Sequence, residues 1–176
     1  MAVVALLFGK LPSHGDFVAR GLPAAERSAL DGWLAGEVDA ARRAFGTAFD
    51  DLYDRAPPWR FARAEGAIGV AGVLAPSIDR AGRRYPLYLA LAGVSADALA
   101  PAAQWCEDML HEAFVEGWQA DRLVEEAACF NGGAAAAGWT GARWWSDGGE
   151  GFAPGVVEGL RPPRLLSMML QPQEDA

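Results

Sequence analysis

Ser13, His14 and Asp16 bring together, within four positions, the side-chain types of a serine hydrolase. A hydroxyl nucleophile, an imidazole base and a carboxylate catalyse acyl transfer when they converge from separate parts of a fold. Near neighbours along one loop point in different directions, so this spacing does not predict a triad. Lys10 and Gly15 suggest a phosphate-binding loop, but no Lys-Ser or Lys-Thr pair follows the glycine. We expect a shaped loop in which Ser13 or Asp16 bonds main-chain amides, or a loop that belongs to a binding surface.

Three arginines, Arg80, Arg83 and Arg84, occur with Ser77 and Asp79 in a second short segment. Guanidinium groups bind phosphates and carboxylates in bidentate fashion, so one interpretation is a site for a phosphopeptide or another anion. The alternative is an ion pair between Asp79 and an arginine that fixes the turn, while the other arginines are solvated or pack along a sheet. Both interpretations stay open at this point.

Trp144 and Trp145 form an adjacent aromatic pair after Arg143. Neighbouring residues of a strand face opposite sides of a sheet, so only one of the two is expected in the core. The other tryptophan is expected to cover a sheet edge or to contribute to an interface.

Metal and cofactor sites are not expected. Glu107 and His111 are spaced as two ligands on one helix face, but no third ligand is near them, so we predict a solvated face. Cys106 and Cys129 show no ligand spacing and are expected to be reduced, mostly buried thiols. No catalytic residue is therefore assigned.

The elements that position these residues follow from hydrophobic periodicity. A continuous apolar run at residues 3–8 predicts a strand buried on both faces, followed by a loop over residues 10–21. Apolar residues at helical spacing predict a long helix over residues 23–45, with Glu37 on its polar side. Further expected elements are a helix at 48–55, strands at 59–63, 67–74 and 85–91, a helix capped by Asp97, a helix at 121–128, a flexible Ala/Gly stretch from Asn131, a hairpin joining 142–146 to 151–152, and a helix at 165–170.

Three consecutive strands with short links favour antiparallel pairing. The predicted fold is mixed α/β (α+β): one domain over residues 1–176, with a largely antiparallel central sheet of about five to six strands and helices packed on it. By analogy of element order, this arrangement is profilin-like or longin-like.

The chain carries a formal net charge of −8. Phosphates and anionic lipid surfaces would be repelled, so we expect no nucleic acid and no membrane surface among its partners. The sequence contains neither a signal peptide nor an apolar run of the roughly 20 residues that span a bilayer. These features predict a cytoplasmic protein whose partners are other proteins.

The same segments carry a family resemblance. Residues 8–18 closely resemble the opening signature of the TagF (ImpM-like) accessory proteins of bacterial type VI secretion. The second and third signatures are similar to residues 59–61, 72–74, 76–80, 82–83 and 86–87, and then to Trp144, Trp145 and the proline-rich segment before Leu165. The ordered set covers nearly the whole chain.

This resemblance implies a post-translational repressor of type VI secretion, and not an enzyme. Such proteins act by binding the FHA-domain scaffold protein of the apparatus, until a signal such as threonine phosphorylation relieves the block. Some members continue into a protein-phosphatase domain, and none is expected here. The candidate partner-binding surface comprises the polar residues of the two loops and the tryptophan pair: Lys10, Ser13, His14, Asp16, Ser77, Asp79, Arg80, Arg83, Arg84, Trp144 and Trp145.

Two other functions remain as alternatives. One is a sensor of phosphopeptides or nucleotides that uses Arg80, Arg83 and Arg84. The other is a serine-type hydrolase that uses Ser13 or Ser77 with His14.

Overall fold

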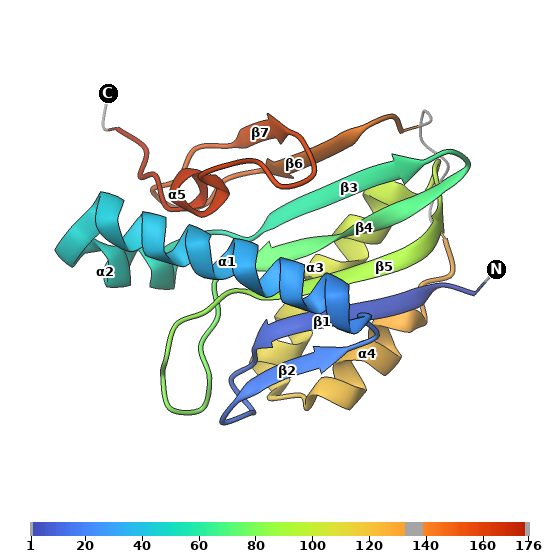
Figure 1. Ribbon diagram of the computed structural model, residues 1–176, viewed down its shortest axis with the longest axis horizontal. Coiled ribbons are helices and arrows are strands. Elements are labelled where there is room, and N and C mark those ends of the chain that lie inside the picture. Colours follow the sequence, from blue (N-terminus) through green and yellow to red (C-terminus); the bar gives the residue numbers. More distant parts are fainter. Residues whose placement is uncertain (1, 133–138, 175–176) are drawn as a thin grey trace.

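One antiparallel sheet organises the protein, whose computed structural model describes residues 2–132 and 139–174 (Figure 1). Its seven strands lie in the order β2-β1-β5-β4-β3-β6-β7, and every neighbouring pair is antiparallel. The strands are β1 (Val4–Lys10), β2 (Phe17–Arg20), β3 (Trp59–Glu65), β4 (Ile68–Ala75), β5 (Leu87–Ser95), β6 (Ala142–Ser146) and β7 (Gly155–Glu158). The α-helices are α1 (Ala24–Phe45), α2 (Phe49–Arg55), α3 (Leu99–Glu116), α4 (Ala120–Ala128) and α5 (Leu165–Met169). The predicted α+β class is confirmed.

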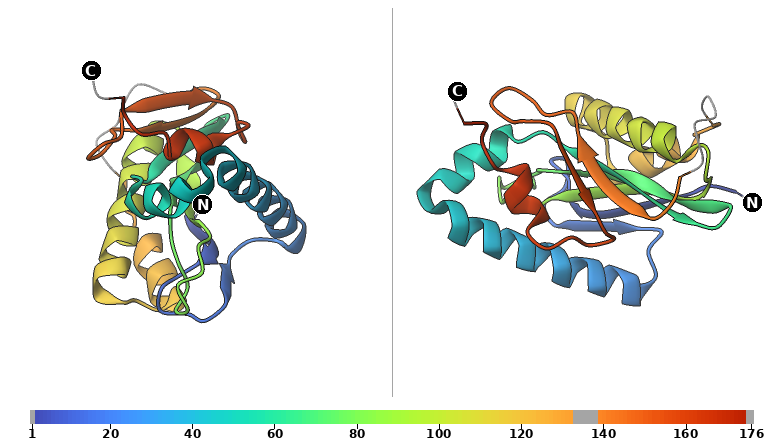
Figure 2. Two further views of the ribbon diagram at one scale, coloured as in Figure 1. Left: turned by 90° about the vertical axis from the view of Figure 1, so that its left-hand side faces the viewer. Right: turned by 90° about the horizontal axis from the view of Figure 1, so that it is seen from above.

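Helices cover both faces of this sheet, as the end-on view in Figure 2 shows. Helices α3 and α4 pack on one face, and α1, α2 and α5 on the other. Successive side chains of β1 enter the two cores alternately: Leu7 faces α3 and α4, whereas Leu6 and Phe8 face α1. A strand buried on both faces needs apolar residues at every position, which explains the continuous run that predicted β1.

The neighbours of β1 are far apart in the sequence. It pairs with β2 on one side and with β5 on the other, where Leu7 lies opposite Leu89. Gly9 makes the close pairing of β1 with β5 possible. Its φ is +133°, and a Cβ atom there would lie 2.1 Å from the carbonyl oxygen of Pro86.

The sheet is larger than the predicted five to six strands. Strand β2 lies within the segment that was expected to be a loop, with Val18 buried and Phe17 and Arg20 at its ends. Four residues at a sheet edge are too few to show a hydrophobic period, so the pattern did not reveal this strand. The hairpin partner of β6 also lies later in the sequence than the predicted residues 151–152. Gly149 and Phe152 form only an isolated bridge, and β6 pairs with Gly155–Glu158.

The start of α3 differs from the prediction. The helix begins at Leu99, with Ala98 at the cap position and no side-chain capping bond. Asp97, the predicted cap, instead accepts a hydrogen bond from the hydroxyl group of Ser95. The predicted Ala/Gly stretch falls mainly on residues 133–138, which lie outside the described residues.

Glu37 lies on the buried face of α1, not on the solvent side as predicted. Its carboxylate accepts hydrogen bonds from the amides of Arg164 and Leu166, at 3.0 and 2.9 Å. These amides open the short helix α5, so one carboxylate satisfies two donors that the helix itself cannot. Glu37 thereby attaches α5 to α1.

None of the helices in the described residues is long and apolar enough to cross a membrane.

Candidate functional site

Two connections between strands meet at one end of the sheet (Figure 1). The β1–β2 connection and the β4–β5 connection are adjacent because β1 and β5 are antiparallel neighbours. We call residues 10–17 and 76–86 together the two-loop junction. It contains nine of the eleven predicted surface residues, from Lys10 to Arg84, although the two segments are remote in the sequence.

Asp79 holds the two-loop junction together. It is 1% exposed, and its Oδ2 atom lies 2.9 Å from Lys10 Nζ and 2.7 Å from Arg83 Nε. Its Oδ1 atom accepts hydrogen bonds from the amides of Ala81 and Arg83, at 2.9 and 3.0 Å. Burial alone would raise the pKa of Asp79, but the bonds from Lys10 and Arg83 together bring the pKa below its usual range. The carboxylate therefore stays ionised and bridges both loops.

Helix α2 anchors the β4–β5 connection from the other side. The hydroxyl group of Tyr53 is hydrogen-bonded to the main chain of Ser77. Arg84 pairs with Asp54 in bidentate fashion, through Nε and Nη2 at 2.8 and 2.7 Å. The hydrogen bonds from Arg84, together with its positive charge, hold the pKa of Asp54 below its usual range, although burial opposes this. Arg84 is thus a structural residue of the two-loop junction.

The other two arginines cross from one loop to the other. Arg80 donates through its guanidinium to the carbonyl of Ser13, and through its amide to the carbonyl of His14 at 2.8 Å. Arg83 donates through Nη2 to the carbonyl of Gly15 at 2.8 Å. The predicted ion pair between Asp79 and an arginine is therefore present, with Arg83 as its partner. Both guanidinium groups remain at the surface.

The candidate hydrolase residues are not brought together as a triad. Ser13 Oγ donates to the carbonyl of Trp118 at 2.7 Å, and Ser77 Oγ donates to a main-chain carbonyl of β1 at 2.7 Å. His14 Nε2 accepts from the amide of Ala120 at 3.1 Å. Within the described residues, neither hydroxyl is hydrogen-bonded to the imidazole. The bonds of Ser13 and His14 instead tie the β1–β2 connection to the segment between α3 and α4, and the bond of Ser77 ties the β4–β5 connection to β1.

A groove of about 520 Å³ lies beside the β4–β5 connection. Its lining includes Pro12, Ile78 and Phe114 together with the Asp54–Arg84 pair. Ile78 is 37% exposed, and Phe17 at the start of β2 is 47% exposed. Phe17, Ile78 and Phe114 were not among the predicted site residues. For Ile78, a large apolar side chain within a polar loop is a signal that could have indicated an exposed contact.

Trp144 and Trp145 lie outside the two-loop junction, because strands β5, β4 and β3 separate β6 from β1. Trp144 is buried against Phe61, with ring centroids 4.5 Å apart. Trp145 is half-buried on the opposite face, where it packs against Trp139 and below Arg60. The prediction that only one tryptophan enters the core is confirmed, but the pair does not extend the surface formed by the loops.

The described residues contain no group of three or more side chains able to hold a metal ion. Glu107 instead lies 3.0 Å from Arg60 in an ion pair. Burial raises the pKa of Glu107 and of the Cys106 thiol. Cys106 is buried as predicted, whereas Cys129 is exposed.

Comparison with known proteins shows a family match and a similar solved structure. The family model described as "TagF N-terminal domain, Type VI secretion system-associated" matches residues 7–129, which include the whole two-loop junction. The crystal structure of PA0076 from Pseudomonas aeruginosa PAO1, at 2.05 Å resolution, superposes with a TM-score of 0.75 and 26% sequence identity. The likeness covers 98% of this chain and 96% of that one, so it includes the segment from β6 to α5 that follows the matched residues. No curated protein matches the sequence.

Proposed function

Because this chain belongs to the type VI secretion system-associated TagF N-terminal-domain family, we propose that it is a post-translational negative regulator of type VI secretion. It acts in the cytoplasm by binding the FHA-domain scaffold protein of the apparatus. Binding covers a scaffold surface that assembly requires, so the mechanism is occlusion and not catalysis.

The observation that carries this proposal is the exposed face of the two-loop junction. Phe17 and Ile78 expose apolar side chains there, and Arg80 and Arg83 expose guanidinium groups in the same two loops. Aromatic and arginine side chains dominate the energetics of many protein interfaces. Exposed arginines at one place on a chain of net charge −8 give the partner a defined orientation.

The hydrogen bonds inside the two-loop junction support a role in recognition. Asp79 fixes the two loops relative to each other, and Arg80 bridges them again. A surface that is already ordered loses little conformational entropy when a partner binds. The candidate nucleophiles Ser13 and Ser77 are used in the same framework, where they donate to main-chain carbonyls.

Isothermal titration of the purified FHA-domain scaffold protein with this chain tests the proposal. The variant Ile78→Asp/Arg80→Gln should lower the affinity at least tenfold, because it removes one apolar and one cationic contact. The matched control is Ile68→Asp/Arg27→Gln, which makes the same chemical changes at exposed positions outside the two-loop junction. Equal affinity of the two variants, or no binding by the unmodified protein, would refute the proposed surface.

Secretion in the native bacterium gives the second readout. Deletion of the gene should raise secretion, and overproduction should lower it. Complementation with the control variant should restore repression, whereas the Ile78→Asp/Arg80→Gln variant should not. Unchanged secretion after both deletion and overproduction would contradict a repressor.

A further inference from the structure

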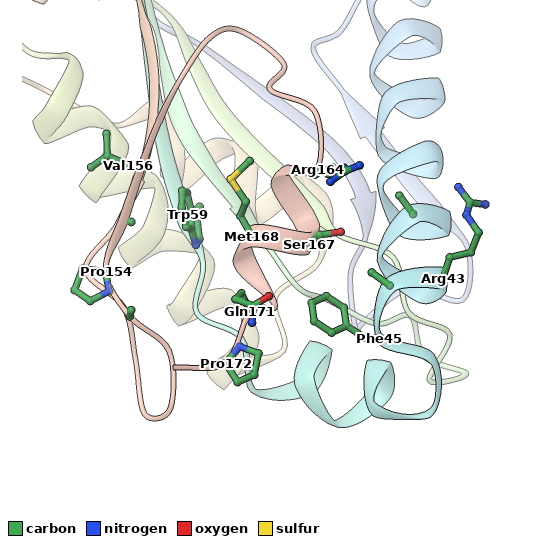
Figure 3. Close-up of a pocket in the computed structure, with 14 residues that line it drawn as sticks. Arg43, Phe45, Trp59, Pro154, Val156, Arg164, Ser167, Met168, Gln171 and Pro172 are labelled. Carbon is green, nitrogen blue, oxygen red and sulfur yellow. The ribbon is translucent and has the colours of Figure 1, made fainter. Parts of the chain in front are cut away.

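A second and larger groove lies on the α1 face of the molecule, away from the two-loop junction (Figure 3). It has a volume of about 1030 Å³ and is bounded by the last turns of α1, by the start of β7 and by α5. In Figure 3, Arg43 and Phe45 line the α1 side, Pro154 and Val156 line the β7 side, and Met168 lies between them. Neither the family match nor the proposed function gives this groove a role.

The groove combines apolar surface with positive charge. Met168 is 38% exposed, so one large apolar side chain is open to solvent in the groove. Val156 is 66% exposed and lies opposite Trp145, so its side chain is directed to the other face of β7. Arg43 and Arg164 also line it. Among the described residues, neither guanidinium group forms an ion pair with a carboxylate within 4.0 Å, whereas the guanidinium groups of most other arginines of this acidic chain do. The chemistry that complements this lining is an apolar segment with carboxylates.

The wall formed by β7 is the edge of the sheet, and no further strand among the described residues pairs with it. The amide of Gly159 donates to the carbonyl of Ala142, on the β6 side. Amides alternate in direction along an antiparallel strand, so Val157 also points to β6 while Val156 and Glu158 point outward. An edge with outward amides is a template for an added strand.

The groove is formed before any partner arrives. Glu37 holds α5 in place through the amides of Arg164 and Leu166. The ring of Trp59 packs against Gly155 so closely that a Cβ atom there would lie 2.5 Å from it. An ordered lining of this kind favours binding because little has to rearrange.

We propose that this groove binds an extended segment of a partner protein in which apolar and acidic side chains alternate. The segment pairs with β7 through its main chain, as in other cases of β-strand addition. Alternate side chains of an added strand face opposite sides of the sheet, so its apolar side chains contact Val156 on one face and its carboxylates pair with Arg43 and Arg164 on the other. This site is separate from the surface assigned to the scaffold protein.

A fluorescence-polarisation titration with two labelled nonapeptides tests the charge preference. One peptide alternates valine with glutamate, and the other alternates valine with lysine. The net charge of −8 favours the lysine peptide at long range, so only local contacts in the groove can reverse that order. The glutamate peptide should bind at least tenfold more tightly, and a preference for the lysine peptide would overturn the proposal.

Substitutions then locate the site. Arg43→Gln/Arg164→Asn should weaken binding of the glutamate peptide at least tenfold; asparagine is chosen because Arg164 has a left-handed φ of 63°. Arg27→Gln, on the same helix α1 but outside the groove, is the matched control and should leave affinity within twofold. An equal effect of both variants would contradict binding in the groove.

Strand pairing has its own test, which leaves the protein unchanged. Two versions of the glutamate peptide are N-methylated at alternate residues, in opposite phases. Only one phase places its methyl groups against β7, so the two affinities should differ at least tenfold. Equal affinities would overturn strand addition. Formation of a dimer of this chain that Arg43→Gln dissociates would also overturn it, because the occupant would then be a second copy.

Discussion

The hydroxyl group of Tyr53 makes two hydrogen bonds with one residue, Ser77: it accepts from the amide at 3.0 Å and donates to the carbonyl at 2.9 Å. All three groups are buried. Tyr53→Phe removes the acceptor of the Ser77 amide, and an unsatisfied buried donor costs about 1–3 kcal/mol of stability. Urea unfolding should show a loss of this size. Tyr88→Phe is the control, because the Tyr88 hydroxyl has no hydrogen-bond partner in the described protein, and its effect should stay within about 0.5 kcal/mol. Equal losses in the two variants would refute this role.

The carboxylate of Asp79 should make stability depend on pH. Its pKa is lowered in the folded protein relative to about 3.9 in an unfolded chain. The stabilising contribution is therefore complete above pH ~4 and is lost as the pH falls toward the folded pKa. The difference in unfolding free energy between the native protein and Asp79→Asn should be constant from neutral pH to about 5 and shrink below about 4. Unfolding curves at several pH values measure it, and a difference that grows on acidification would contradict the assignment.

Gly9 is expected to tolerate no side chain. In Gly9→Ala, the new Cβ would lie 2.1 Å from the Pro86 carbonyl oxygen at a φ of +133°. Strand β1 must then move away from β5, at a cost on the order of 3 kcal/mol or more. Thermal unfolding should show this loss. Gly15→Ala, where a Cβ atom meets nothing within 4 Å, should change stability by at most about 0.5 kcal/mol.

Glu37 should control the attachment of α5. Glu37→Ala leaves the amides of Arg164 and Leu166 without their acceptor, with an expected loss of about 1–3 kcal/mol. The loss is local, so limited proteolysis should cut the segment after β7 earlier than in the native protein. Asp39→Ala, at an exposed position on the same helix, is the control. Cleavage that begins elsewhere in the chain would argue against this role.

The sequence was sufficient to predict those elements whose buried residues form a long hydrophobic pattern. Strand β1 and helix α1 were predicted because each presents a sustained apolar run or a helical period. Strand β2 was missed because it is short and lies at an edge. Glu37 was predicted on the solvent side because a charged residue is normally solvent-exposed. Nothing in the sequence around Glu37 shows that α5 packs over it.

The candidate site was predictable in its parts and not in its assembly. Glycine, proline and arginine marked both loops as distinctive. The pairing of Asp79 with an arginine was predicted, but its second partner, Lys10, could not be foreseen, since Lys10 reaches Asp79 only through the pairing of β1 with β5. Trp144 was grouped with the loops because sequence cannot show how many strands stand between two segments.

The pairing of β1 with β5 also limits how early the sheet can form while the chain is being synthesised on the ribosome. Leu7 lies opposite Leu89, so β1 is synthesised long before β5 exists. Contacts between such distant segments close slowly and give slow folding. The edge of β1 that pairs with β5 therefore stays unpaired until β5 has been synthesised, and an apolar strand with an unpaired edge is a site at which a nascent chain aggregates or a chaperone binds.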